Sequence, residues 1–310
     1  MTSTASPAIF DRRLVRARGL RAAGLGPSTF LLERVARELS DRVACVQRRF
    51  EWVVDLGTPT SAVRRELARA GHIGTIVTAN ASGGCLHLRR ASDQLVAGGL
   101  AVAADEEALP FRAASLDLVV SALSLQFVGD LPGTLTQIRR ALKPDGLLLA
   151  AFVGGDSLCE LRQSFAAAEA EVEDGVSPRV IPFVDVRAAG SLLQRAGLAL
   201  PVTDLDRITV RYESPMALMH DLRAMGATNP MIERSRRTLR HATLMRMMEI
   251  YGERFSDPDR RIRATFEIIW LSGWAPHSSQ QEPLAPGSAQ ASLADALGVK
   301  EHSAGERAER

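Results

Sequence analysis

The sequence predicts an α/β fold built around a mostly parallel sheet, because short apolar runs alternate with helix-like segments between residues 52 and 153. The runs are apolar almost throughout instead of alternating with polar residues, which is typical of strands that helices cover on both faces. Parallel sheets of this kind bind ligands beyond the carboxyl ends of their strands. We therefore expect a ligand site where those ends gather.

The predicted elements follow one another in order along the first half of the chain. Thr58 is predicted to cap a helix that Pro59 begins, since proline fits the first helical position. A later helix is expected to start near residue 131 and to end before a turn at 143–146. The predicted strands cover residues 52–57, 73–78, 100–103, 117–123 and 147–153.

The second half is predicted to carry a helical insertion before the last strand. Helices are expected at 160–173 and 186–196, a strand at 208–212, a helical block at 215–255 and a final strand at 262–270. The predicted division of the chain is a helical segment at 1–45, a main domain at 46–275 with its insertion at 214–256, and a tail at 276–310. The tail is rich in Pro, Gly, Ser and Gln, which predicts partial disorder.

The overall charge gives no argument for nucleic acid or a membrane as partner, because 38 basic residues nearly balance 36 acidic ones. Two local groups of arginines stand out, and we interpret both as solvated helix faces. They are Arg12, Arg13, Arg16, Arg18 and Arg21, and then Arg234, Arg236, Arg237 and Arg240. We expect no nucleic-acid partner, and at most a peripheral membrane association through a protein partner.

The cysteines and the apolar runs bear on where the protein works. The three cysteines are odd in number and far apart, which argues against a disulfide framework and suits a reducing compartment. No apolar run approaches the ~20 residues needed to span a bilayer. The first residues lack the apolar core of a signal peptide. Together these features predict a cytoplasmic protein.

Several segments resemble a known family. Residues 117–146 resemble the fourth strand, the following helix and the turn of class I S-adenosylmethionine methyltransferases. Outside this core, residues 10–12, 104–111, 152–162, 181–183 and 194–197, and a tail with Gly273, Trp274 and His277, are similar to the arginine-hydroxylase family of respiratory complex I assembly factors. The resemblance begins at about residue 9 and ends near residue 290, so we expect a bacterial member without a mitochondrial presequence.

The resemblance implies a fold, a cofactor and a partner. It implies a Rossmann-like class I methyltransferase fold with a seven-stranded, mostly parallel sheet, S-adenosylmethionine as cofactor, and a protein substrate such as a complex I subunit. Two other functions stay open, since a fold hosts many functions. One is a malonyl-acyl-carrier-protein O-methyltransferase of biotin synthesis, which shares the central strands. The other is a non-catalytic assembly chaperone with a methyltransferase fold.

The cofactor-binding residues that the resemblance implies stand at the ends of the predicted strands. Asp55 and Gly57 end the first strand, and Asn80 follows the second. The remaining four are Asp105 and Glu106, where the family contacts the adenine edge, and Ser121 and Leu123, beside the cofactor after the fourth strand. Asp55 also has a structural interpretation as a cap for the next turn, and Asp105 as an ordinary loop acid. Taken in order along the strands, these residues favour one cofactor cleft.

The sequence departs from the family's pattern in two places. Residues 58–61 replace the later glycines of the turn, and Pro59 lacks the N–H that such a loop offers to a carboxylate. A helix N-terminus is still expected to follow, and its dipole favours an anion. Asn80 replaces the acidic residue that accepts hydrogen bonds from both ribose hydroxyls, and a neutral amide forms weaker bonds than a charged group. These departures favour the chaperone hypothesis.

The sequence predicts no metal site and names no catalytic residue. Arginine hydroxylation would ordinarily need a redox metal or an organic cofactor, for example iron held by two histidines and a carboxylate. None of the six histidines begins a His-x-Asp/Glu pair. His277 lies in the part of the tail that resembles the family, and we interpret it as a hydrogen-bonded packing residue.

Overall fold

The chain divides into two units in this computed structural model, which describes residues 8–81, 100–173, 175–281, 288 and 291–300. The units are Met1–Pro276 and His277–Arg310. The second contains the short helix α10 (Leu293–Leu297), which the sequence did not predict. The predicted disorder of the tail concerns mainly residues outside those described. Among the described helices, none has both the length and the apolar character needed to cross a bilayer.

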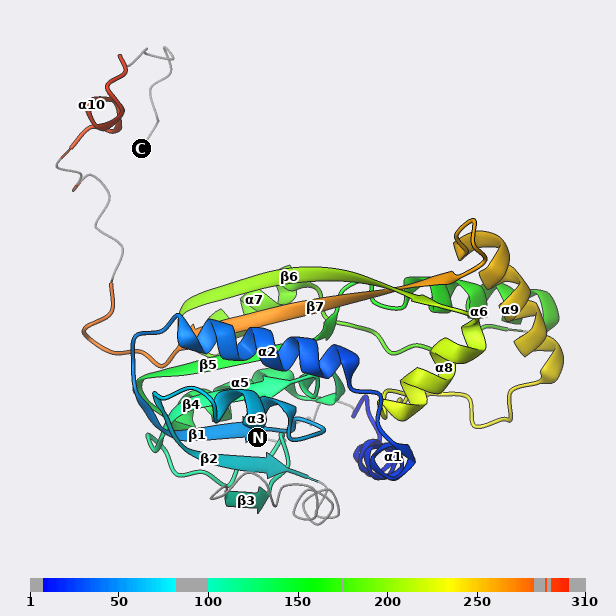
Figure 1. Cartoon of the computed structure of the whole chain (residues 1–310), viewed down its shortest axis with the longest axis horizontal. Coiled ribbons are helices and arrows are strands. Elements are labelled where there is room, and N and C mark those ends of the chain that lie inside the picture. The colour runs from blue at the N-terminus through cyan, green and yellow to red at the C-terminus, as the bar shows by residue number, and fades with distance from the viewer. Residues whose placement is uncertain (1–7, 82–99, 174, 282–287, 289–290, 301–310) are drawn as a thin grey trace, which may run out of the picture. The chain divides into compact units, whose positions relative to one another are not determined.

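Seven strands form one sheet in the first unit (Figure 1): β1 (Phe50–Leu56), β2 (Ile73–Asn80), β3 (Leu100–Ala103), β4 (Leu116–Ala122), β5 (Leu142–Gly154), β6 (Ala199–Tyr212) and β7 (Ile262–Trp274). Their order across the sheet is β3-β2-β1-β4-β5-β7-β6. Strands β1 to β5 pair in parallel, and β7 runs antiparallel to both of its neighbours. The prediction of a seven-stranded, mostly parallel sheet is confirmed.

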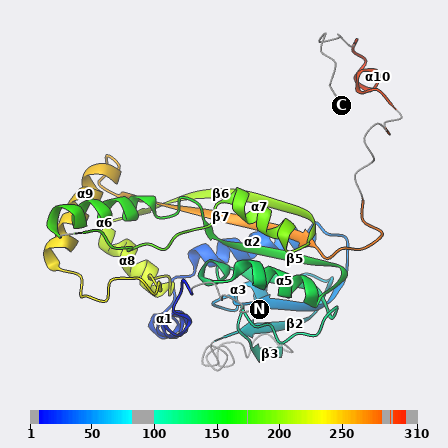
Figure 2. The same ribbon diagram turned by 180° about the vertical axis from the view of Figure 1, so that it is seen from behind.

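Helices cover both faces of this sheet, and each face has its own hydrophobic core. On one face lie α2 (Phe30–Ala44) and α3 (Ala62–Leu67), with α2 in front of the sheet in Figure 1. On the opposite face lie α5 (Leu131–Ala141) and α7 (Val186–Arg195), which Figure 2 shows from behind. The central strands are therefore buried on both sides, which explains why their sequences are apolar throughout.

The connection from β6 to β7 forms the helical insertion, which contains α8 (Pro215–Ala224) and α9 (His241–Phe255). The helix α6 (Cys159–Val172), which follows β5, packs against α9. The prediction of one helical block was wrong for the segment between α8 and α9. Gly226 there adopts a left-handed conformation with φ +73°, which ends a helix, and Pro230 cannot continue one.

The helix α1 (Arg12–Leu25) lies against this insertion, although the two are far apart in sequence (Figures 1 and 2). Phe10, just before α1, forms an antiparallel β-bridge with Met231. The Arg18 side chain donates a hydrogen bond of 2.8 Å to the carbonyl oxygen of Thr228. The N-terminal segment is thus fixed to residues that lie between α8 and α9.

The predicted helix start at Thr58 and Pro59 was wrong, because α3 begins only at Ala62. The Thr58 hydroxyl oxygen instead accepts a hydrogen bond of 3.2 Å from the backbone N–H of Ala122, at the end of the neighbouring strand β4. This contact between strands keeps Thr58 in the turn after β1. Pro59 and Thr60 line a cavity at this turn, which is described below.

The predicted turn at residues 143–146 also differs, because these residues belong to β5. The backbone N–H of Asp145 donates to the carbonyl oxygen of Ala275 at 3.0 Å, and the N–H of Ala275 donates to Gly146 at 2.8 Å. Pairing with a partner from the far end of the domain therefore extends the strand. Likewise β6 begins at Ala199, before the predicted start at 208, because it pairs with β7 along its length.

Candidate cofactor and substrate cavity

A cavity of about 360 Å³ lies at the carboxyl ends of β1, β2 and β4. Its volume falls within the range of about 300–1,000 Å³ that small-molecule sites occupy. Four of the predicted cofactor residues line it: Gly57, Asn80, Glu106 and Leu123. The other walls come mainly from α1, α2, α6, α8 and the segments 179–183 and 225–229. The cavity lies where a parallel sheet of this kind binds its ligand.

The other three predicted residues lie behind the cavity wall. Asp55 is fully buried within β1. The Ser121 hydroxyl is also fully buried, and it donates a hydrogen bond of 2.8 Å to the carbonyl oxygen of Leu56. Asp105 is held by arginines of α1. The structure therefore brings all seven residues to one end of the sheet but gives only four of them a surface on the cavity.

Gly57 makes the turn after β1 with φ +71°, a conformation that glycine adopts without strain. Its N–H donates a hydrogen bond of 2.7 Å to the carbonyl oxygen of Ala79. A Cβ atom at this position would lie 2.3 Å from the Ser124 hydroxyl oxygen and 2.6 Å from a carboxylate oxygen of Glu106. No side chain fits there, so the position requires glycine.

Asn80 faces the same turn from the end of β2. Its amide nitrogen lies 3.4 Å from the carbonyl oxygen of Gly57 and 3.5 Å from that of Thr58, and donates to both. The side chain is almost completely buried. Asn80 thus connects β2 to the turn by its N–H groups, a role that the acceptor-only carboxylate of the family pattern cannot take.

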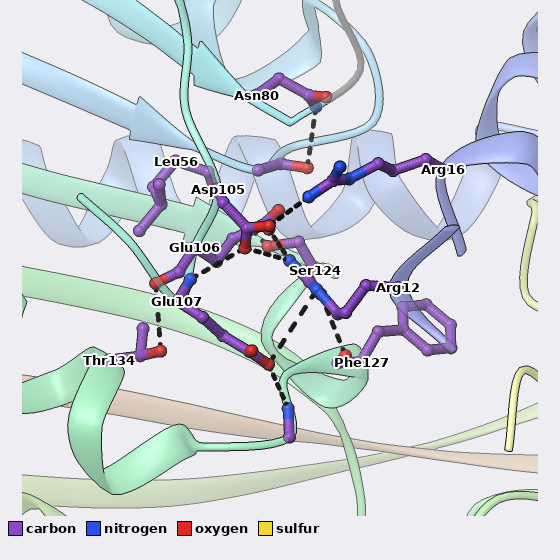
Figure 3. Close-up of polar contacts among 12 residues, drawn as sticks. Arg12, Arg16, Leu56, Asn80, Asp105, Glu106, Glu107, Ser124, Phe127 and Thr134 are labelled. Carbon is purple, nitrogen blue, oxygen red and sulfur yellow. Dashed lines mark hydrogen bonds and ion pairs between the residues drawn. The ribbon is translucent and has the colours of Figure 1, made fainter. Parts of the chain in front are cut away.

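Two arginines of α1 form an ion-pair cluster with Asp105 and Glu106 beside the cavity (Figure 3). Arg12 lies 2.6 Å from Asp105, pairs with Glu106, and donates a hydrogen bond of 3.1 Å to the carbonyl oxygen of Phe127. Arg16 pairs with the second carboxylate oxygen of Asp105. Sequence reasoning missed this cluster, because it treated both arginines as solvated. Their spacing of four residues, which places them on one helix face, was the available signal.

The charges in this cluster stabilise one another. Burial opposes the charge of Arg12, but Glu106 and Asp105 outweigh that effect and raise the pKa of the guanidinium. Burial would likewise raise the pKa of Asp105. The backbone N–H of Glu107 and the charges of Arg12 and Arg16 outweigh it, so the pKa of Asp105 lies below its ordinary value. The cluster therefore favours the ionised form of Asp105.

We expect an Asp105→Asn variant to lose stability at neutral pH and to match the unmodified protein in acid. Because the pKa of Asp105 is lowered from 3.8 on folding, its ionised form stabilises the fold above that pH. This stabilisation is lost as the pH falls through the lower, folded-state pKa. Urea unfolding across this pH range would measure it. A difference between the two proteins that stays constant down to the lowest pH would contradict the assignment.

Two leucines that line the cavity have backbone conformations that leucine seldom adopts. Leu123 has φ +52° and Leu158 has φ +54°. The N–H of Leu123 donates to Ala151 and that of Leu158 to Thr265, both at 2.8 Å. A bulky residue in the left-handed region is strained, and such strain clusters at functional sites, where the surroundings enforce it. The side chains of both leucines are thereby placed against the cavity.

The segment 152–162, singled out in the sequence, forms a buried polar network that holds Leu158. The Ser157 hydroxyl donates to the carbonyl oxygen of Gly154 at 2.6 Å and accepts from the backbone N–H of Glu267 at 2.8 Å. The Glu160 carboxylate accepts from the hydroxyl of Thr265 at 2.5 Å and from its N–H at 3.1 Å. These bonds join the turn after β5 to β7.

The cavity walls away from the strand ends are mainly apolar but carry arginines. Arg179 pairs with Glu169 at 2.6 Å and lies over the ring of Phe165 at 5.8 Å. Among the described residues that line the cavity, Glu106 is the single carboxylate. The apolar residues of these walls include Leu161, Phe165, Ile181, Phe183, Met219, Leu222 and Phe266, and the arginines are Arg12, Arg16, Arg179 and Arg223.

The structure also shows the surroundings of His277 and how the possible metal-binding side chains are arranged. His277 is exposed, and its Nδ1 lies 2.7 Å from the hydroxyl oxygen of Ser279, so it is not the packing residue that the sequence suggested. Within the part of the chain that the structure describes, no group of three His, Cys, Asp or Glu side chains is arranged to hold a metal ion. The structure thus adds no candidate metal ligands.

The strand order and the cavity at the carboxyl ends define a class I methyltransferase-like protein. Residues 54–150 match the family model described as a methyltransferase domain. A crystal structure of a Bacillus halodurans methyltransferase covers 78% of this chain and 99% of its own, with a TM-score of 0.55 and 14% identity. The YcgJ protein of Bacillus subtilis covers 77% and 98%, with a TM-score of 0.54 and 13% identity. These structures agree on the fold.

Relatives that match most of the chain identify its family. Arginine-hydroxylase NDUFAF5 of Danio rerio is 37% identical over 93% of this chain and 89% of its own length, and the Homo sapiens protein is 38% identical over 95% and 85%. A malonyl-acyl-carrier-protein O-methyltransferase of Gallionella capsiferriformans is 32% identical over 86% and 92%. The chain belongs to the arginine-hydroxylase NDUFAF5 family of methyltransferase-like proteins. The resemblance seen in the sequence is confirmed.

Proposed function

We propose that this protein binds S-adenosylmethionine in the cavity and modifies an arginine side chain of a protein, such as a complex I subunit during assembly. The observation that carries the proposal is the convergence of Gly57, Asn80, Glu106 and Leu123 on one cavity at the strand ends. The relatives named as arginine hydroxylases supply the substrate class. We propose further that it works in the cytoplasm and meets a membrane only through its partner.

The residues present fit the cofactor. Gly57 lines the cavity at the turn after β1, Asn80 supplies an amide, and Leu123 supplies an apolar wall. In this proposal Asp55, Asp105 and Ser121 support those groups from behind. When bound, the cofactor supplies an electrophilic methyl group on a positively charged sulfur. The apolar walls exclude water from that region.

An arginine substrate suits the chemistry of the ion-pair cluster. Glu106, Asp105 and the carbonyl oxygen of Phe127 already bind one guanidinium group, that of Arg12. Two carboxylates and a carbonyl oxygen are the acceptors that the fork of guanidinium N–H groups requires. Glu106 also lines the cavity, so it can meet a cationic group that enters. These contacts support, for this chain, the substrate class named in its relatives.

Other observations favour the two alternative functions. Arg16, Arg179 and Arg223 line the mainly apolar part of the cavity, which would suit an acyl chain that ends in a carboxylate. That observation favours a malonyl-acyl-carrier-protein O-methyltransferase, whose sequence is also similar. Pro59 in the turn and the neutral Asn80 favour a non-catalytic scaffold.

One titration separates the scaffold from both enzymes. We expect calorimetry with S-adenosylmethionine to show saturable binding to the purified protein, with a dissociation constant from about micromolar to millimolar. If no heat of binding is detected at millimolar S-adenosylmethionine, the non-catalytic scaffold becomes the favoured function. Mass spectrometry of complex I subunits from a deletion strain would then test for a lost arginine modification. Methyl transfer to malonyl-acyl-carrier protein, with the subunits unchanged, would favour the acyl substrate.

A further inference from the structure

Arginines from both groups that the sequence suggested were solvated helix faces come together in the fold, since Arg234 of the second group lies beside Asp11 at the start of α1. The β-bridge between Phe10 and Met231 places the start of α1 against the segment that follows α8. The bond from Arg18 to the Thr228 carbonyl oxygen fixes the middle of α1 to the same segment. We call the resulting group the basic surface. It consists of Arg16, Arg18, Arg21, Arg223 and Arg234.

Most of the positive charge on the basic surface is uncompensated. Within the described part of the chain, Arg18, Arg21 and Arg223 have no ion pair. Arg234 lies 3.8 Å from a carboxylate oxygen of Asp11, and Arg16 pairs with Asp105. Burial and the nearby charges of Arg234 and Arg21 lower the pKa of Arg18, and together they outweigh the opposing effect of Asp11. Like charges held this close repel one another, and a bound anionic partner would relieve the repulsion.

The basic surface is continuous with the cavity. Arg16 and Arg223 line it, from α1 and α8 respectively, while Arg21 is exposed to solvent. The chain between residues 223 and 240 has five arginines but a single acidic residue, Glu233. A polypeptide that places one side chain in the cavity would therefore lay its neighbouring residues along guanidinium groups.

We propose that the basic surface docks an acidic segment of a protein partner, next to the residue that enters the cavity. The proposal rests on the proposed function in one respect, that the cavity accepts a protein side chain. The same charges would attract an anionic lipid surface. A polypeptide fits better, because two of the five arginines line a cavity that a side chain enters and a planar array of headgroups does not. Arginine also binds carboxylates with paired N–H groups.

The test uses a fluorescein-labelled peptide of alternating glutamate and glycine, with fluorescence anisotropy as the readout. We expect it to bind the full chain, and added salt to weaken the binding. In the double variant Arg21→Glu, Arg223→Glu the affinity should fall at least about tenfold. The matched control is Arg49→Glu, Arg112→Glu, which makes the same charge change at exposed positions before β1 and β4, at the amino ends of strands whose carboxyl ends form the cavity. Its affinity should stay within about twofold of the unmodified protein.

Two other outcomes of the peptide experiment overturn the proposal. Equal losses in both variants, with circular dichroism showing both folded, would mean that the peptide senses only net charge. If the peptide does not bind but phosphatidylserine vesicles do, and the Arg21, Arg223 variant loses the vesicles, the surface binds membranes instead. The cofactor titration of the unmodified protein is independent of these results. If the peptide binds at this surface but the cofactor does not bind, the proposed docking surface is supported and the proposed enzymatic function is contradicted.

Discussion

A Gly57→Val variant should bind no S-adenosylmethionine at millimolar concentration. Its Cβ atom would lie 2.3 Å from the Ser124 hydroxyl oxygen and 2.6 Å from the Glu106 carboxylate, so both side chains would have to move into the cavity. The left-handed backbone with φ +71° adds strain of about 1–3 kcal/mol for a residue other than glycine. Isothermal calorimetry measures the lost binding, and chemical denaturation measures the lost stability.

The matched control for this experiment is Gly71→Val. A Cβ atom on Gly71 would meet no other atom within 4 Å, and this glycine has no positive φ. The control therefore introduces the same side chain into a turn on the amino side of β2 without filling the cavity. It should bind the cofactor as the unmodified protein does. Unchanged affinity in Gly57→Val would place the cofactor site elsewhere in the molecule.

A Glu160→Ala variant should lose about 3 kcal/mol of unfolding free energy. The carboxylate of Glu160 is almost completely buried, and it accepts both the N–H and the hydroxyl hydrogen of Thr265. Removing it leaves two buried donors without an acceptor, and each such donor costs about 1–3 kcal/mol. Leu158 would also lose its support, so the cavity wall should loosen. Urea unfolding measures the free energy.

Two comparisons make this prediction specific. Glu171→Ala changes an exposed glutamate of the same helix, α6, and should leave the unfolding free energy nearly unchanged. Thr265→Val removes the hydroxyl donor, so the double variant Glu160→Ala, Thr265→Val should lose less than the sum of the two single losses. Additive losses would mean that the two side chains do not depend on each other, and the proposed network would be wrong.

The buried central strands could be predicted from short segments of the sequence. The run at 117–123 is apolar except for Asp117 and Ser121, which predicts a strand covered on both sides, and β4 lies there. Local sequence is misleading where a contact with a residue distant in sequence decides the structure. Thr58 and Pro59 have the composition of a helix start, but a contact with Ala122 holds Thr58 in a turn. The Asp145 segment looks like a turn, but Ala275 extends it as a strand.

The candidate site was predictable in part for the same reason. Gly57, Asn80, Glu106 and Leu123 follow strand ends, whose position a parallel sheet fixes, and all four line the cavity. The contribution of α1 could not be predicted that way. Arg12 pairs with Asp105, which lies 93 positions further along the chain, and only the folded chain brings the two together. The spacing of Arg12 and Arg16 indicates a shared helix face, but it does not show which carboxylates that face meets.

The bridge between Phe10 and Met231 has a consequence for synthesis on the ribosome. Chains emerge with their N-terminal residues first, and domains generally begin to fold in that order. Here α1 emerges among the first elements, but its partner segment at 228–231 is made only after six of the seven strands. Thr228 of that segment also lines the cavity, so this part of the cavity wall is completed only after the segment has been made. A nascent chain thus completes much of its sheet while its ligand pocket is still open on one side.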